Sequence, residues 1–342
     1  MKRLAVNIRC LSAPVSGVQR YTTELLSRLN QLERISPSRP LHGISGHLWE
    51  QVILRTKLDD NILLWSPANT GPLCVRRQIV SIHDLSAIEH PEWFTPQFAK
   101  WYSFLLPRLA QRVQKIITMS TFSKNRMLAL WGLPDEKIIV IPEGVDERFH
   151  PVEDTAEKRS LLQIPAGPYL LALGSLEPRK NLNRLLRGWE IIQHKIPKEI
   201  WLVLAGAKGK NSIFKDAGID SIPSRVHLTG YVPEAALPAL YSGAIGFIYP
   251  SLYEGFGLPT LEAMACGTPV IASQATSLPE VLGDNAIFID PFQVESIAFA
   301  IEQLVENSTL RAKLIQQGSK RAANFTWQHS AEQTLATLIG IA

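Results

Sequence analysis

Short apolar segments alternate with amphipathic segments along the chain, and this alternation restricts the possible folds more than any other feature of the sequence. Short apolar segments are typical of β-strands buried on both faces, and the segments between them have helical periodicity. Strands that alternate with helices predict parallel sheets covered by helices on both faces. The expected strands are 4–8, 62–65, 78–83, 116–119, 138–141, 169–174, 201–206, 226–229, 245–249, 270–273 and 287–290. The expected helices are 18–31, 96–113, 122–131, 182–194, 233–242, 259–266, 294–306, 310–324 and 328–339.

The chain is longer than one hydrophobic core usually supports, with 342 residues against a limit of about 250–300. The polar stretch 146–168 contains proline and separates the two sets of strands, so it is a natural linker. We therefore expect an α/β protein with two Rossmann-like parallel-sheet domains that face each other across a cleft. The first domain is expected at 1–160 and the second at 161–327, with a final helix at 328–342 packing back on the first. Ligands in such sheets bind at the carboxyl ends of the strands, so the cleft is the expected active site.

The cysteines and the short apolar runs indicate the cellular compartment of the protein. Cys10, Cys74 and Cys266 are an odd number without metal-ligand spacing, which predicts reduced thiols in a reducing compartment. The start MKRLAVNIRCL has only a short apolar run, which favours a first β-strand over a signal peptide. No apolar stretch approaches the roughly 20 residues that span a bilayer. We expect a cytoplasmic protein, soluble or peripheral on the inner face of the membrane.

Charge is distributed unevenly along the chain. Residues 1–150 carry a net charge of +6 and the remainder carries −2. Within the basic half, the segment from Phe98 to Lys115 combines aromatic residues with four cations, and Pro107 interrupts it. A basic amphipathic helix is a candidate for peripheral contact with an anionic membrane, whereas most such helices pack their apolar face on their own sheet. No nucleic-acid partner is expected.

The most informative motif lies at 249–270, YPSLYEGFGLPTLEAMACGTPV, which has the pattern of strand, glycine-rich loop, helix and strand. Gly255 and Gly257 allow the backbone to approach a ligand closely, and Pro259 suits the first turn of a helix. The free N–H groups and the positive dipole end of that helix then face the loop, which is an arrangement that suits a diphosphate.

Two carboxylates accompany this loop. Glu254 lies on the loop and Glu262 lies on the first turn of the helix, eight residues later, so both can point into one cleft. A carboxylate accepts hydrogen bonds from neighbouring hydroxyl groups, which suits a sugar. The alternative is that the glycines and the helical glutamate only build a stable strand–helix turn, but the full motif favours a sugar-nucleotide site.

Other candidate residues follow predicted strands. Arg179 and Lys180 can neutralise a diphosphate, Arg179 with a forked pair of N–H donors and Lys180 as a point charge, or they can form a solvated turn. Gly17 joins the first strand to a helix and can bring its backbone to phosphates, although a plain helix start explains it equally well. His83 ends a strand at its carboxyl edge, and an alternative role for the pair His83–Asp84 is to pin the loop.

These motifs resemble the retaining GT-B glycosyltransferases of the group 1 family, glycosyltransferase family 4. The resemblance rests on the two glutamates spaced as E-x7-E with GFGLP between them, and on three further segments, GSLEPRKN at 174–181, GYVP at 230–233 and SLPE at 277–280. It is dense from 169 to 327 and patchier before that. Many relatives place the arginine directly after the strand glycine, where this chain has Ser175, so Arg179 is the candidate substitute.

The resemblance implies a role for each candidate. Arg179 and Lys180 hold the diphosphate, Glu262 the ribose and Glu254 the transferred sugar, while His83 supports the reacting sugar from the first domain. The residues that line the donor are Gly17, Gly255, Phe256, Gly257 and Leu258.

The resemblance also implies a reaction class. It predicts a hexosyltransferase that retains anomeric configuration without a metal or cofactor and moves a hexose from a nucleotide-diphosphate sugar to a saccharide or lipid-linked acceptor. The motif style is similar to bacterial mannosyltransferases of polysaccharide assembly, so GDP-mannose is the first candidate donor. Two alternatives are a nucleotide-sugar epimerase on the same fold and a non-catalytic binding paralogue; the retained glutamates and cations disfavour the paralogue.

Overall fold

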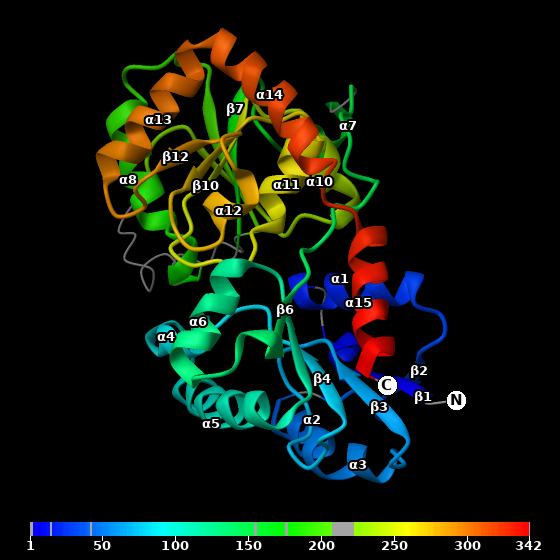
Figure 1. Ribbon diagram of the computed structural model, residues 1–342. Coiled ribbons are helices and arrows are strands. Elements are labelled where there is room, and N and C mark those ends of the chain that lie inside the picture. The colour runs from blue at the N-terminus through cyan, green and yellow to red at the C-terminus, as the bar shows by residue number, and fades with distance from the viewer. Residues whose placement is uncertain are drawn as a thin grey trace. The chain divides into compact units, whose positions relative to one another are not determined.

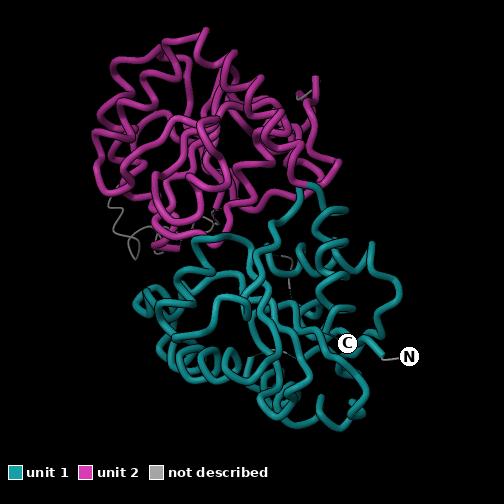
Figure 2. The backbone as a smooth tube through the Cα atoms, in the orientation of Figure 1, with its two compact units in different colours: residues 1–144, 326–342 teal, residues 145–325 magenta. Residues whose placement is uncertain are grey.

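The computed structural model describes residues 3–13, 16–41, 43–153, 156–174, 177–206 and 222–341. The chain divides into two compact units, one formed by Met1–Gly144 with Thr326–Ala342 and the other by Val145–Phe325 (Figure 2). The division lies at Gly144, earlier than the boundary at 160 that the sequence predicted. Ser175, part of the motif that the resemblance uses, lies outside the described residues.

Unit 1 is built on a six-stranded parallel sheet in the order β2-β1-β3-β4-β5-β6 (Figure 1). Every residue of β3 and β4 is buried, as expected of strands covered on both faces. The strands are β1 (Arg3–Asn7), β2 (Glu33–Ile35), β3 (Ile62–Ser66), β4 (Gln78–Ser81), β5 (Lys115–Thr118) and β6 (Ile138–Val140). The helical elements are η1 (Arg9–Ser12), α1 (Gly17–Arg28), α2 (Gly43–Leu48), η2 (Trp49–Ile53), α3 (Leu54–Thr56), α4 (Ser86–Glu89), η3 (Pro91–Trp93), α5 (Pro96–Arg112), α6 (Thr121–Trp131), η4 (Asp135–Lys137) and α15 (Trp327–Ile341).

Unit 2 contains a second six-stranded parallel sheet, in the order β12-β11-β10-β7-β8-β9. One apolar cluster of the described residues joins the sheet to α8 and α13, which lie side by side (Figure 1). The strands are β7 (Tyr169–Leu173), β8 (Trp201–Ala205), β9 (Val226–Gly230), β10 (Gly246–Tyr249), β11 (Val270–Ser273) and β12 (Ile287–Ile289). The helical elements are α7 (Ala156–Leu161), η5 (Pro178–Lys180), α8 (Leu182–Ile192), η6 (Glu234–Ala236), α10 (Leu237–Ser242), α11 (Leu258–Ala265), α12 (Leu278–Leu282), α13 (Val294–Glu306) and α14 (Ser308–Ala322).

The prediction of an α/β protein with two parallel sheets is confirmed. The short strand β2 and the helical segment from Gly43 to Thr56 were not predicted from the sequence, whereas α5 confirms the predicted helix 96–113 and contains Pro107 in its interior. Among the helices of the described residues, none combines the length and the apolar character needed to span a bilayer.

The helix α15 belongs to unit 1 although it follows all of unit 2 in the sequence. Its first residue, Trp327, is fully buried and packs edge-on against the ring of Tyr21 of α1, with ring centroids 6.1 Å apart. A second attachment joins the Ser330 hydroxyl to the carbonyl of Pro142 at 2.6 Å. The helix is therefore part of the core of unit 1.

Replacing Trp327 by Ala should lower the free energy of unfolding of unit 1 by about 3–5 kcal/mol, because it removes a large buried side chain and leaves a cavity. The matched control is Ile339→Ala on the same helix, where the side chain is 60% exposed and the expected change is small. Urea unfolding followed by circular dichroism measures both variants. Equal stability of the two variants would contradict a core role for α15.

Candidate functional site

The candidate site of unit 2 lies where the order of its strands reverses. The chain runs from β7 outward to β8 and β9, and then returns to β10 on the other side of β7. Loops that leave the carboxyl ends of two such neighbouring strands diverge and leave a crevice for ligands. Arg179 and Lys180 follow β7, and Glu254 follows β10, so the strand order brings residues about 75 positions apart into one cluster.

Glu254 forms ion pairs with both Lys180 and Arg179. Lys180 Nζ lies 2.7 Å from Glu254 Oε1, and Arg179 Nη1 lies 3.3 Å from Glu254 Oε2. Arg179 Nε also lies 2.6 Å from Oε2 of Glu177, whose side chain is 44% exposed. Lys180 and Glu254 are buried, so their attraction is screened far less than that of a surface pair.

Tyr249, the last residue of β10, completes this cluster. Lys180 Nζ donates to its hydroxyl at 2.8 Å and lies 4.9 Å from the centre of its ring. Burial, together with the nearby charge of Glu254, raises the pKa of Tyr249 well above its ordinary value, so the phenol stays neutral. This contact between Lys180 and Tyr249 was not predicted, because its only local signal in the sequence is an aromatic residue at the end of a strand.

The ionisation of the buried pair follows from its partners. Burial opposes the charged form of Glu254, but the charges of Lys180 and Arg179 outweigh it and hold the pKa of this carboxyl below its usual value. Burial lowers the pKa of Lys180, and the charge of Glu254 counteracts that effect. The cluster is therefore a buried ion pair whose carboxylate occupies positions that an anionic ligand could take.

Main-chain contacts fix the two loops against each other. The N–H of Leu252 donates to the carbonyl of Arg179 at 2.7 Å. The side-chain amide of Asn181 donates to the carbonyls of Pro250 and Pro291, at 3.0 and 2.7 Å. Asn181 has a left-handed φ of 57°, which asparagine tolerates better than most residues. It is a second site residue that the sequence analysis did not single out, although it ends the segment GSLEPRKN.

The glycine-rich turn leads directly into α11. Gly257 has a φ of 99°, and a Cβ atom there would lie 2.4 Å from Cδ2 of the buried Leu278. The Ser277 hydroxyl donates to the carbonyls of Glu254 and Phe256, at 2.9 and 3.1 Å, and so holds the turn. The helix begins at Leu258, with Pro259 in its first turn.

The side chains of this turn differ in what they can offer a ligand. Phe256 and Leu258 are buried, and Phe256 packs against Phe325 with centroids 5.8 Å apart. Glu262 is also buried on α11, and its Oε2 accepts a hydrogen bond from the Tyr241 hydroxyl at 3.1 Å. Because its side chain is buried, Phe256 can contact a ligand only through its backbone.

The other predicted residues belong to unit 1. His83 follows β4, and its ring is held by acceptors: Nε2 lies 2.9 Å from the Pro67 carbonyl and Nδ1 lies 3.5 Å from Glu143 Oε1. Its ring also packs edge-on against Tyr21, with centroids 4.7 Å apart. Asp84 caps the following turn by accepting from the N–H and hydroxyl of Ser86, at 2.9 and 2.7 Å.

Gly17 is the first residue of α1 and is exposed. A Cβ atom built on Gly17 would meet no heavy atom within 4 Å. Packing within the protein therefore does not require glycine at this position.

Within the described ranges, no group of three or more histidine, cysteine, aspartate or glutamate side chains could hold a metal ion. The metal-free mechanism stays a prediction.

Comparison with known proteins connects this geometry to a family. The model described as "Glycosyl transferases group 1" matches residues 154–321, and the model described as "Glycosyltransferase Family 4" matches residues 61–149. The first match contains the whole cation–carboxylate cluster. The chain belongs to the group 1 glycosyltransferases.

Relatives of this group 1 glycosyltransferase include the O-antigen chain mannosyltransferase B of Escherichia coli, which is 28% identical over 94% of this chain and 95% of the relative. A Mycolicibacterium hassiacum MMP α-(1→4)-mannosyltransferase is 30% identical over 71% of this chain and 59% of its own length. Among solved structures, the Anabaena protein HepE in complex with UDP-glucose is 18% identical, covers 99% of both chains and has a TM-score of 0.77. WaaG, a glycosyltransferase involved in lipopolysaccharide biosynthesis, is 15% identical, with a TM-score of 0.74 over 98% of this chain and 100% of that one. The glycosyltransferase therefore has the GT-B fold.

Two glycine substitutions should separate folding from ligand binding in this glycosyltransferase. Gly257→Ala should lower the free energy of unfolding of unit 2 by about 1–3 kcal/mol, because the left-handed φ and the contact with Leu278 both disfavour a Cβ atom. Gly17→Ala should leave stability unchanged, because a Cβ atom there meets no neighbour, and it should weaken binding of a sugar nucleotide, the predicted donor, whose phosphates the Gly17 backbone is predicted to approach. Urea unfolding and calorimetric titration with the donor measure the two effects. Unchanged donor affinity in Gly17→Ala would remove Gly17 from the site.

Proposed function

We propose that this glycosyltransferase moves a hexose from a nucleotide-diphosphate sugar to a saccharide or lipid-linked acceptor during glycan assembly. The observation that carries the proposal is the cluster of Arg179, Lys180 and Glu254 at the strand reversal of unit 2. Mannose is the first candidate sugar and GDP-mannose the first candidate donor, because relatives along most of the chain are named mannosyltransferases.

We propose that binding of the donor exchanges partners within this cluster. In the structure, the single carboxylate of Glu254 pairs with both Lys180 and Arg179. The donor diphosphate brings negative charge to the same cations and so displaces the carboxylate from them. Glu254 is then available to accept hydrogen bonds from hydroxyl groups of the transferred hexose. The cations stabilise the charge that develops on the leaving diphosphate.

The remaining residues have supporting roles in the proposal. Glu262, with Tyr241 beside it, holds the ribose, and the backbone from Gly255 to Leu258 lines the phosphates. Gly17 brings its backbone to the donor. His83 supports the reacting sugar; a hydrogen bond between its Nδ1 and a sugar hydroxyl requires Nδ1 to exchange Glu143 for the substrate.

We propose transfer with retention of anomeric configuration and without a metal. The acceptor attacks from the face that the diphosphate leaves, and the leaving phosphate helps to remove the acceptor proton. We propose the cytoplasm as the compartment, since Cys10, Cys74 and Cys266 are free thiols. A lipid-linked acceptor would bring the enzyme to the inner face of the membrane.

Two charge-changing substitutions should shift nucleoside-diphosphate affinity in opposite directions. Arg179→Ala should weaken binding of GDP by at least about tenfold, because it removes a charged donor. Glu254→Gln should tighten binding of GDP several-fold, since it removes the carboxylate charge that competes with the diphosphate for both cations, yet lower turnover on the order of a hundredfold. Isothermal titration calorimetry, run with a panel of nucleoside diphosphates, gives the affinities.

Glu177→Gln is the control, because it also removes a partner of Arg179 but from an exposed position where screening weakens the pair. Its effect on affinity should be small. If Glu254→Gln weakens GDP binding as Arg179→Ala does, the partner exchange is wrong. If the wild type binds no nucleoside diphosphate, the proposed donor class fails.

Transfer of mannose from GDP-mannose should continue in excess EDTA, and the product should keep the anomeric configuration of the donor. The acceptor is a purified glycan primer, with and without a lipid anchor, and NMR spectroscopy of the product gives the configuration. Activity that disappears with EDTA and returns with Mg²⁺ or Mn²⁺ would contradict metal independence. Conversion of the donor to an isomeric sugar nucleotide without acceptor would favour an epimerase.

A further inference from the structure

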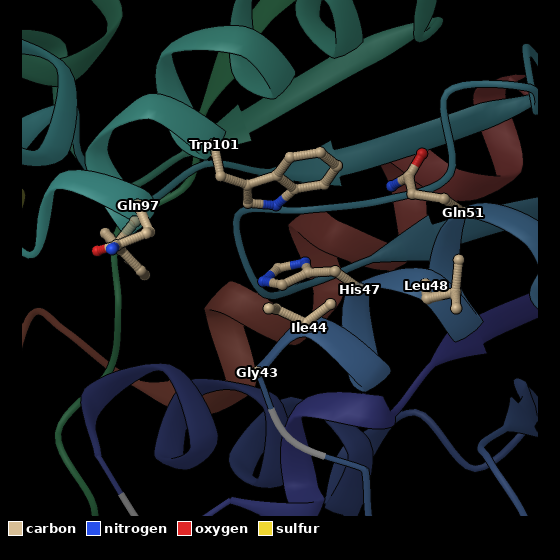
Figure 3. Close-up of a pocket in the computed structure, with 8 residues that line it drawn as sticks. Gly43, Ile44, His47, Leu48, Gln51, Gln97 and Trp101 are labelled. Carbon is tan, nitrogen blue, oxygen red and sulfur yellow. The ribbon is translucent and has the colours of Figure 1, made fainter.

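An apolar pocket with a volume of about 460 Å³ lies in unit 1, and none of the residues placed in the candidate site lines it (Figure 3). It is formed by unit 1 alone, between the helical segment 43–53 (α2 and η2) and the N-terminal half of α5. Its volume is within the range of small-molecule sites, which is roughly 300–1,000 Å³. The residues that line it are Gly43, Ile44, His47, Leu48, Gln51, Gln97, Phe98 and Trp101.

Both walls of the pocket continue into exposed apolar surface. On α2 and η2, Ile44, Leu48 and Val52 recur every four residues and are 89%, 61% and 57% exposed. On α5, the exposed residues Phe98 and Phe104 extend the surface. An exposed apolar surface of this kind commonly marks an interaction site.

The apolar side chains of α5 serve two purposes. Leu105, Leu106 and Leu109 are buried, as a helix that covers a sheet requires. Phe98 and Phe104 are not among these buried residues, and aromatic contacts order this outer side: Phe98 stacks on Tyr102, and Trp101 on Phe104. The helix α5 therefore carries more apolar side chains than its packing on the sheet requires.

The polar groups that line the pocket are the amides of Gln51 and Gln97 and the ring nitrogens of His47 and Trp101. The amide of Gln51 is already used, since Nε2 donates to the Gly71 carbonyl at 2.8 Å and Oε1 accepts from the Leu73 N–H at 3.0 Å. Nδ1 of His47 and Nε1 of Trp101 are buried without a hydrogen-bond partner, Nδ1 lies 3.9 Å from Glu50 Oε2, and the two rings are tilted by 60° with centroids 5.4 Å apart (Figure 3). A saccharide would lose its hydrogen bonds with water there, whereas a hydrocarbon chain would not.

The two helical segments that carry the apolar surface are mostly basic. Residues 96–112 contain Lys100, Arg108 and Arg112 and no acidic residue. Residues 43–57 contain Arg55 and Lys57, and their one acidic residue, Glu50, is buried; Arg55 is paired with Asp60, just beyond this segment, at 2.9 Å. Arg108 covers the Phe104 ring at 4.0 Å, so cation and apolar surface are adjacent. The matching partner is an amphiphile with an apolar chain and an anionic headgroup.

We propose that this pocket takes one acyl chain of an anionic bilayer lipid, and that α2, η2 and α5 lie in the headgroup layer of the membrane. Ile44, Leu48 and Phe98 contact the chain, and Lys100, Arg108 and Arg112 contact the phosphates. Trp101 and Tyr102 suit the interfacial layer, where amphipathic rings concentrate. The proposal is independent of the sugar donor and extends the membrane contact expected for residues 98–115 to a second helical segment and a defined pocket.

The test is co-sedimentation of the full chain with vesicles of phosphatidylcholine alone or mixed with phosphatidylglycerol. Wild type should bind the mixed vesicles and bind the neutral ones much more weakly. The variant Ile44→Ser/Leu48→Ser should bind the mixed vesicles at least about tenfold more weakly, because two apolar side chains no longer enter the lipid. The control Phe299→Ser/Ile339→Ser removes apolar side chains that are 59% and 60% exposed elsewhere and should bind as wild type does.

A second measurement locates the chain. Acyl chains carrying bromine quench nearby indole fluorescence, so brominated mixed vesicles should quench part of the tryptophan emission, and Trp101→Phe should remove that part. Urea unfolding shows whether each variant keeps its fold.

Several outcomes would overturn the proposal. They are absence of vesicle binding, equal binding of neutral and anionic vesicles, unchanged binding by Ile44→Ser/Leu48→Ser, and quenching that survives in Trp101→Phe. A wild-type dimer in analytical ultracentrifugation that this double variant abolishes would assign the surface to a second copy of the chain instead.

Discussion

The buried contact between Lys180 and Glu254 is the interaction on which the site of unit 2 depends. Burying two charges is costly, and such a pair persists only when its geometry is good and additional hydrogen bonds satisfy its remaining atoms. Here Tyr249 supplies one such bond, and the hydroxyls of Thr276 and Ser277 hold the backbone of Glu254. Removing only one charge of such a pair typically costs about 3–5 kcal/mol. In the proposed partner exchange, the incoming anion therefore has to replace the negative charge that Lys180 loses when Glu254 is displaced.

The two units use opposite physical chemistry. Unit 2 gathers buried charge at its strand reversal, where water is largely excluded and electrostatic attraction is strong. Unit 1 carries the excess of basic residues and an apolar pocket in which the Gln51 amide is already paired and the ring nitrogens of His47 and Trp101 are buried. The first arrangement suits small anionic ligands, and the second suits apolar ligands with anionic ends. In the two proposals made above, unit 2 recognises charge and unit 1 recognises an apolar chain.

Local sequence patterns predicted most strands and most helices, and they singled out Arg179, Lys180 and Glu254 individually, but they did not predict the contacts among these residues. The pairing of Lys180 with Glu254 requires β10 to lie beside β7, and no local pattern specifies that order. The strand β2 has three residues, of which only Ile35 is buried, so it carries almost no periodic signal. The segment 43–56 was missed for another reason: its apolar residues face solvent as well as the core, which obscures the helical pattern.

The placement of α15 has a consequence for the order in which the protein can fold. Unit 2 is one continuous stretch of chain, whereas unit 1 is split and needs Trp327, which is synthesised only after all of unit 2. Until Trp327 has been synthesised, the ring of Tyr21 lacks its edge-on contact with the Trp327 ring. On the ribosome, the later half of the sequence can reach its native packing before the earlier half does, which reverses the usual N-terminal-first order. The hydrogen bond between Val145 and Phe325, the first and last residues of unit 2, closes that unit on itself without any help from unit 1.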